Sequence, residues 1–190
     1  MDLGAEILKE RQASYVRLRG GFPVPLAGAT YWAAVGGLGY VVGPSLWVFW
    51  SFIASGTIFP LAILYAAVLR NNFLKDTNAL GGVLLPAFVS MLLFWPMAIA
   101  AWWTDAQLVP LVLAIGMSLH WPVIGWSYGR TALFTAHAVV RAIVVFLLWW
   151  LMPESRFTVI PFAVAATYLV TVVVILIDSG AQTRKLAAAG

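Results

Sequence analysis

Six long apolar stretches, separated by short polar breaks, constrain this chain more than any other feature of its sequence. Each stretch is close to the ~20 residues that a helix needs to cross the ~30 Å hydrocarbon core of a bilayer. The breaks are too short to hold a folded domain, so neighbouring helices must run antiparallel. We therefore predict six transmembrane helices, at Pro23–Val42, Leu46–Leu69, Gly81–Trp103, Leu108–Tyr128, Ala132–Met152 and Thr158–Ile177.

The composition excludes a soluble fold. Of the 190 residues, 63% are hydrophobic and 9% are charged, whereas soluble domains contain about 25% charged residues. A soluble domain of this size leaves much of its surface in water and has no means of burying so many apolar side chains. The fold class that we predict is all-α, a polytopic transmembrane helical bundle of six spans with a short N-terminal amphipathic helix.

The distribution of polar residues divides the chain into three parts. Residues 1–21 form a cytoplasmic or interfacial N-terminal segment, residues 22–178 form the six-span domain, and residues 179–190 form a cytoplasmic tail. Two interpretations of the first segment stay open: an amphipathic helix that lies in the membrane surface, or a solvated and frayed end. In the longest break, Asn78 is expected to cap the N-terminus of the third span.

Lysine and arginine residues fall almost entirely on one side of the predicted bundle. By the positive-inside rule that side is cytoplasmic, and it holds both termini. Pairs of tryptophans at the opposite helix ends form a belt typical of a membrane interface. These patterns predict a multi-pass protein of the bacterial cytoplasmic (inner) membrane. The inner side holds Lys9, Arg11, Arg17, Arg19, Arg70, Lys75, Arg130, Arg184 and Lys185, and the outer side holds Arg156. The belt contains Trp47, Trp50, Trp102, Trp103, Trp149 and Trp150.

The polar residues inside the apolar stretches gather between Gly116 and Arg141. This segment holds both histidines of the chain, His120 and His137, and the one arginine that lies deep in a span. His137 and Arg141 are four residues apart and therefore share a helix face. The tight turn between the fourth and fifth spans makes these spans neighbours, so we expect all three side chains to face the bundle interior.

A buried arginine costs ~2.5 kcal/mol or more unless it finds acceptors or water. No acidic residue lies at a matching depth, and Asp178 is too shallow. Two explanations stay open: a ligand site, or a hydrogen-bond network that fixes helix packing. Expected protein acceptors are the hydroxyls of Ser118, Ser127, Thr135 or Tyr65 and the carbonyls that Pro60 and Pro122 leave unbonded. The candidate ligand-binding residues are His120, His137, Arg141, Pro60, Trp121 and Tyr128.

Proline follows an aromatic residue at four places in or at the start of the predicted spans. Proline frees a backbone carbonyl and kinks a helix. Pro60 and Pro122 occupy matching places in the second and fourth spans, and broken helices at matched positions point to a transporter site. The alternative is that proline is simply common in membrane helices. The four pairs are Phe22-Pro23, Phe59-Pro60, Trp95-Pro96 and Trp121-Pro122.

The residue types present limit the possible cofactors and partners. Zinc needs three or four ligands, and the chain offers two histidines and no cysteine, so no metal site is expected. A haem or chlorophyll held by a single axial histidine is a minor alternative. The basic residues form no single patch, which argues against nucleic acid. The expected partners are membrane lipids, with other membrane subunits or a second copy of the chain as further options.

Three segments recur together in a known family, Ser55–Leu61 (S-G-T-I-F-P-L), Thr77–Gly82 (T-N-A-L-G-G) and Met117–Trp126 (M-S-L-H-W-P-V-I-G-W). The chain resembles a family of uncharacterised bacterial six-helix integral membrane proteins with F-P-L, N-x-L-G and H-x-P-x-x-x-W segments. The resemblance extends over most of residues 30–177. It implies the six-helix fold, singles out His120, Pro122 and Trp126, and implies no known activity.

These observations leave three functions open, in order of preference. The first is binding or transport of a small ligand, lipid or anion in an inner-half pocket between spans. The second is a non-catalytic accessory subunit of a larger membrane complex, packed against pigments or quinone. The third is an intramembrane enzyme, although no nucleophile stands beside a base and an orienting group as catalysis would need.

Overall fold

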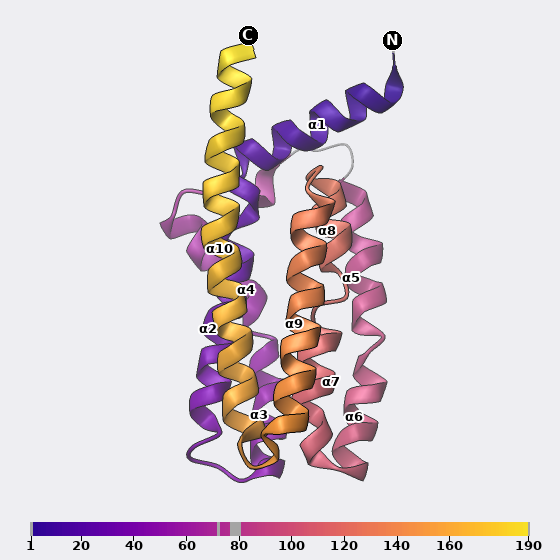
Figure 1. Cartoon of the computed structure of the whole chain (residues 1–190), viewed down its shortest axis with the longest axis vertical. Helices are drawn as coiled ribbons and strands as arrows, with labels where there is room; N and C mark the ends of the chain where they lie inside the picture. The colour runs from indigo at the N-terminus through magenta and orange to yellow at the C-terminus, as the bar shows by residue number, and fades with distance from the viewer. Residues whose placement is uncertain (1, 72, 77–80, 190) are drawn as a thin grey trace.

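Helices build every regular element in the part of the chain that the computed structural model describes, residues 2–71, 73–76 and 81–189. The predicted all-α class is confirmed for these residues (Figure 1). The α-helices are α1 (Leu3–Arg17), α2 (Pro23–Leu38), α3 (Pro44–Ser55), α4 (Ile58–Val68), α5 (Leu84–Leu92), α6 (Trp95–Thr104), α7 (Val109–Gly116), α8 (Trp121–Ser127), α9 (Thr131–Leu151) and α10 (Arg156–Ala189). Short 3₁₀ helices are η1 (Arg19–Gly21), η2 (Phe73–Lys75), η3 (Gly81–Val83), η4 (Ala106–Leu108) and η5 (Pro153–Ser155).

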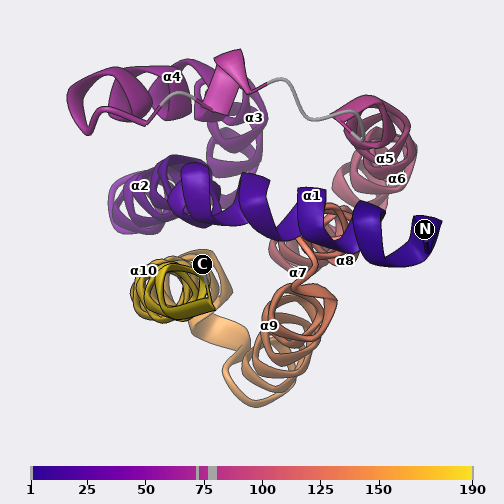
Figure 2. The same ribbon diagram turned by 90° about the horizontal axis from the view of Figure 1, so that it is seen from above.

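From α2 onward the chain runs up and down the long axis, with the pairs α3 and α4, α5 and α6, and α7 and α8 each continuing in one direction, and α1 crosses one end of the bundle obliquely (Figures 1 and 2). Helix α10 packs most extensively on α2, and it also contacts α9. Their contacts run antiparallel: a Cβ added at Gly28 would touch the ring of Tyr168, and one added at Gly39 would touch the backbone of Phe157. The two chain ends lie at the same end of the molecule, beside α1 (Figure 1).

Four helical stretches are long and apolar enough to cross a membrane, and the bent pair α3 and α4 makes a fifth if it counts as one span. Helix α2 has 16 residues and, at ~1.5 Å per residue, spans roughly 24 Å, less than the hydrocarbon core. A membrane protein is therefore supported, whereas the predicted count of six crossings is not confirmed. The four stretches are Gly81–Thr104, Ala106–Ser127, Thr131–Leu151 and Pro153–Lys185.

Three of the predicted spans are broken in the middle, where the sequence indicated only proline kinks. The second span bends by 48° between α3 and α4, the third breaks between α5 and α6, and the fourth breaks between α7 and α8. Each second half restarts within three residues of an aromatic-proline pair, because proline has no N–H to donate and fits the first turn of a helix. These pairs are Phe59-Pro60, Trp95-Pro96 and Trp121-Pro122.

The aromatic belt is only partly at the surface. Trp50, Trp103 and Trp150 are exposed, but Trp47 is fully buried, and its Nε1 donates to the Val35 carbonyl at 2.7 Å. Trp47 therefore does not contribute to the exposed part of the predicted belt. The indole instead joins α3 to α2, since a buried N–H needs an acceptor.

Polar contacts fix α1 across its end of the bundle. The carboxylate of Asp76 accepts from Ser14 at 2.6 Å and from Arg17 at 2.7 Å. Burial, reinforced by the neighbouring carboxylate of Asp178, raises the pKa of the Tyr15 hydroxyl above its ordinary value. Asn78, the expected helix cap, lies outside the described residues. The segment predicted as a C-terminal tail is helical, because α10 continues to Ala189.

Candidate functional site

A cavity of about 500 Å³ lies in the half of the bundle nearer to α1. Its walls come mainly from α2, α4, α5 and α8, with single residues from α3, α6, α9 and α10. All three broken spans meet it: Gly56 at the first break, Phe94 at the second and His120 at the third all line the cavity. The breaks in all three helices therefore lie beside the same cavity.

The cavity is mostly apolar and opens on one side. The lining side chains on α4 and α5, Phe59, Phe88 and Leu92, are substantially exposed, whereas Trp121 and Tyr168 on the opposite wall are buried. The accessible side therefore lies between α4 and α5. An apolar wall with a few polar groups is typical of small-molecule sites, whose volumes run from ~300 to ~1,000 Å³.

His120 is the polar side chain at the third break. It occupies the N-cap position of α8, directly before Trp121, and only 8% of its surface is exposed. Its ring lies 4.9 Å from the ring of Phe88 and 5.4 Å from that of Trp121. Its Nδ1 has no hydrogen-bond partner in the described part of the chain. A buried group of this kind is available to a ligand that enters the cavity.

Arg141 lies behind this wall and is fully buried. Its Nη1 donates to the hydroxyl of Tyr168 at 2.7 Å, and its guanidinium carbon lies 5.4 Å from the ring centre of Trp32. Each of these two residues comes from a helix that the sequence did not connect with Arg141. Asp178 instead pairs with Arg130 at 2.8 Å.

Among the described residues the guanidinium of Arg141 bonds to Tyr168 and to none of the hydroxyls or carbonyls predicted as its acceptors. The hydroxyls of Ser118 and Ser127 donate to carbonyls of their own helical turns, and Tyr65 bonds to Thr30. Serine near a helix end commonly satisfies a local carbonyl in this way. Tyr168 takes the role because α10 carries its ring beneath α9, a contact that no local sequence pattern reveals.

His137 faces away from the cavity. It lines a separate open groove of about 530 Å³ between α9 and α10, and its Nδ1 lies 2.7 Å from the Thr171 hydroxyl. Its ring is nevertheless 4.7 Å from that of Trp121. The imidazole therefore packs on the back of the cavity wall without reaching the cavity.

The six predicted ligand-binding residues divide into three groups. His120, Trp121 and Tyr128 line the cavity. Arg141 and His137 lie behind it, and Pro60 is exposed outside it, although the preceding Phe59 is a wall residue. Sequence reasoning missed Tyr168 and Trp32. No local pattern marks these two residues. The recurring aromatic-proline pair was a signal for two other wall residues, Phe59 and Trp95.

A family model matches residues 7–178, which is most of the chain. Its description is a family of unknown function, DUF7010. The chain belongs to this family. The DUF7010 match covers every residue named above in the cavity and behind its wall. No curated protein and no solved structure matches the chain.

Proposed function

We propose that this protein binds a small, largely apolar molecule in the cavity and transports it through the membrane. The observation that carries the proposal is the meeting of three broken helices at one cavity. Irregular backbone at membrane depth is tolerated where it is buried in protein or lines a cavity. Broken helices that meet near the middle of the bilayer are a recurring feature of transporter binding sites.

The shape and chemistry of the cavity support an amphipathic ligand that enters from the bilayer. Phe59, Phe88 and Leu92 form the exposed rim at the level of the apolar helices, where lipid chains surround the protein. The apolar body of a ligand would lie among these side chains, and its polar group would meet His120 or Trp121. Burial of apolar surface contributes about 25 cal/mol per Å² to binding of this kind.

We also propose six crossings, with both termini on the cytoplasmic side of a bacterial inner membrane. Helix α2 is short, but it lies against α10, a helix long enough to span. Gly20 packs near Ile175, and Gly39 packs near Phe157, so the chain from η1 to the end of α2 follows α10 from Ile175 back to its first turn. A segment that packs along a membrane helix shares its depth, which supports α2 as the first crossing.

Blocking the cavity tests the proposed function. Gly56 lines the cavity in an ordinary right-handed conformation, and a Cβ there meets only the carbonyl oxygen of Ile53, at 3.4 Å. A Cβ can therefore be accommodated at this lining position, and we expect the larger side chain of Gly56→Leu to reduce the space in the cavity. Gly37 is an exposed glycine of α2 with nothing within 4 Å of its Cβ position, and Gly37→Leu is the matched control.

The measurement is native mass spectrometry of the full chain after incubation with a bacterial lipid extract. We expect a bound small molecule on the unmodified protein and on Gly37→Leu, and a loss of at least tenfold in occupancy on Gly56→Leu. Equal occupancy in the two variants, or no bound molecule on the unmodified protein, would contradict the proposal.

A further inference from the structure

A cluster of buried N–H donors without acceptors lies at the back of the cavity. Arg141 uses Nη1 on the Tyr168 hydroxyl, but its Nε and Nη2 have no partner in the described part of the chain. The indole Nε1 atoms of Trp32 and Trp121 are also buried and unpartnered there. Buried donors without acceptors are uncommon in proteins, and each calls for an explanation.

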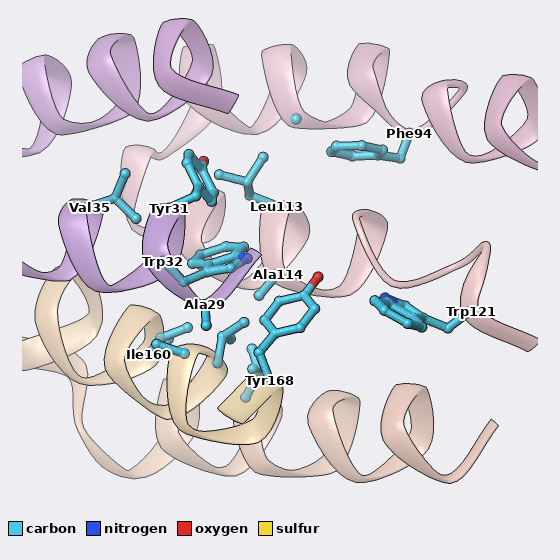
Figure 3. Close-up of a cluster of buried hydrophobic side chains, with 14 of the residues drawn as sticks. Ala29, Tyr31, Trp32, Val35, Phe94, Leu113, Ala114, Trp121, Ile160 and Tyr168 are labelled. Atoms are coloured by element: carbon cyan, nitrogen blue, oxygen red, sulfur yellow. The ribbon is translucent and has the colours of Figure 1, made fainter. Parts of the chain in front are cut away.

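These groups converge from four helices on one place. Figure 3 shows the nitrogen-bearing edges of Trp32 and Trp121 turned toward each other, with the hydroxyl of Tyr168 between them. The guanidinium carbon of Arg141 lies 4.9 Å from the ring centre of Tyr168 and 5.4 Å from that of Trp32. Trp121 and Tyr168 also line the cavity, with ring centres 5.8 Å apart. The donors are thus continuous with the ligand space.

Among the described residues, the cluster has fewer acceptors than donors and no counter-charge. Arginine and the indole N–H only donate, and the Tyr168 oxygen already accepts one bond. His137 offers one neutral acceptor nitrogen nearby, which does not balance a positive charge. Among the described residues no carboxylate lies within 4 Å of Arg141. An uncompensated buried charge is strongly unfavourable, so an anion is the group that this place is suited to hold.

The hydroxyl of Tyr168 connects the charge to the cavity. Because its oxygen accepts from Arg141, its hydrogen is free to donate toward a ligand. A guanidinium that donates to a hydroxyl strengthens that hydroxyl as a donor. Trp121 adds a second donor on the same wall. Arg141 has no exposed surface and therefore acts through Tyr168, as a positioning residue.

We infer that the ligand is a single-chain anionic amphiphile, with its carboxylate or phosphate held by Trp121 and Tyr168 beneath Arg141 and its chain in the apolar cavity. This inference rests on the proposed function, because it names the class of molecule that the cavity takes. The anion supplies an acceptor for Trp121 and Tyr168 and a negative charge opposite Arg141, and the chain replaces lipid contacts along the open side.

The test is competition for binding of radiolabelled hexadecanoate to the full chain in detergent. The competitors are unlabelled hexadecanoate, its methyl ester and hexadecyl phosphate. We expect either anion to compete roughly tenfold to a hundredfold better than the ester, the factor that a charge-assisted hydrogen bond provides. The anion that binds more tightly, hexadecanoate or hexadecyl phosphate, identifies the preferred headgroup. Tighter binding of either anion than of the ester supports the inference.

Variants locate the preference. Arg141→Gln and Tyr168→Phe should bind the ester as before and lose the preference for the anion. Arg156→Gln is the matched control, because Arg156 lies over Trp149, away from the cavity, and should keep the preference. Retained ester binding shows that a variant is folded. If both variants fail to fold, the ratio of anion to ester affinity measured on the unmodified protein still tests the inference.

The outcomes separate the two proposals. Equal competition by anion and ester on the unmodified protein overturns the inference and leaves the proposed function standing. A preference that survives in both Arg141→Gln and Tyr168→Phe overturns the assignment to this cluster. No binding of any of the three compounds overturns the inference, and the mass-spectrometry measurement on the unmodified protein then decides the proposed function.

Discussion

A threonine on α10 determines which ring nitrogen of the buried histidine on α9 carries the hydrogen. The hydroxyl of Thr171 donates to the carbonyl of Thr167 at 2.8 Å, because a carbonyl can only accept. The Thr171 oxygen must therefore accept from His137, whose Nδ1 lies 2.7 Å away and carries the hydrogen. Hydrogen bonds of this kind choose between the two neutral forms of histidine. This residue pair joins the last two helices from the side opposite the cavity.

Thr171→Val should remove that acceptor while it keeps the shape of the side chain. The Nδ1–H of His137 is then buried without a partner, and we expect a loss of about 1–3 kcal/mol in the free energy of unfolding. Denaturant unfolding in detergent, followed by circular dichroism, measures the loss. Thr183→Val is the control, since Thr183 is exposed and bonds only within its own helix; it should stay within about 0.5 kcal/mol. Equal losses would contradict the assigned role.

At the scale of the helices, the break in the third span packs closely against the break in the fourth span. Gly116 ends α7, and a Cβ at this position would clash with the ring of Phe94, one of the two residues between α5 and α6. The glycine thus allows the third and fourth spans to approach each other beside the cavity. Phe94 is itself buried and has little room to move. The position of the cavity wall therefore depends on the absence of one methyl group.

Gly116→Ala should destabilise the protein and disturb the cavity together. Overpacking of a close contact costs about 1–3 kcal/mol, and we expect this loss in thermal unfolding, accompanied by weaker ligand binding. Gly37→Ala, in open space on α2, should be neutral or stabilising by up to about 1 kcal/mol, because alanine favours a helix over glycine. If the two substitutions have the same effect, Phe94 does not hold the break as described.

At the scale of the whole molecule, the arrangement predicts which parts of the chain face each side of a membrane. Tyr40 follows α2 and Glu154 follows α9, at the end of the bundle away from α1, whereas Lys185 lies on α10 beyond α1. All three are exposed. The segments that surround Lys185 carry most of the basic residues, so this end is expected in the cytoplasm.

Single cysteines test this arrangement directly, because the natural chain has none. In intact cells we expect a membrane-impermeant maleimide to label Tyr40→Cys and Glu154→Cys, and to label Lys185→Cys only after the cells are opened. Labelling of Tyr40→Cys and Lys185→Cys from the same side would exclude α2 as a crossing. Labelling of Lys185→Cys alone in intact cells would reverse the orientation.

Part of the site was predictable because it lies within a short segment. His120, Trp121 and Tyr128 fall in one turn-and-helix unit whose aromatic-proline pair marks the break, and all three line the cavity. Pro60 was a correct marker of a break and a wrong candidate for the wall, because Phe59, the residue before it, lines the cavity rim in its place. A local pattern reports that a helix is interrupted and leaves the direction of each side chain undetermined.

The sequence by itself determined that this chain forms apolar helices of membrane-spanning length, because hydrophobicity and helix length are properties of consecutive residues. It also showed that Arg141 needs partners that its own segment lacks. Only the tertiary structure decided what those partners are. Tyr168 reaches Arg141 across 27 residues of sequence, and Thr171 reaches His137 across 34. Such contacts depend on how each helix is rotated against its neighbour, and lipid-facing and buried positions look alike in an apolar sequence.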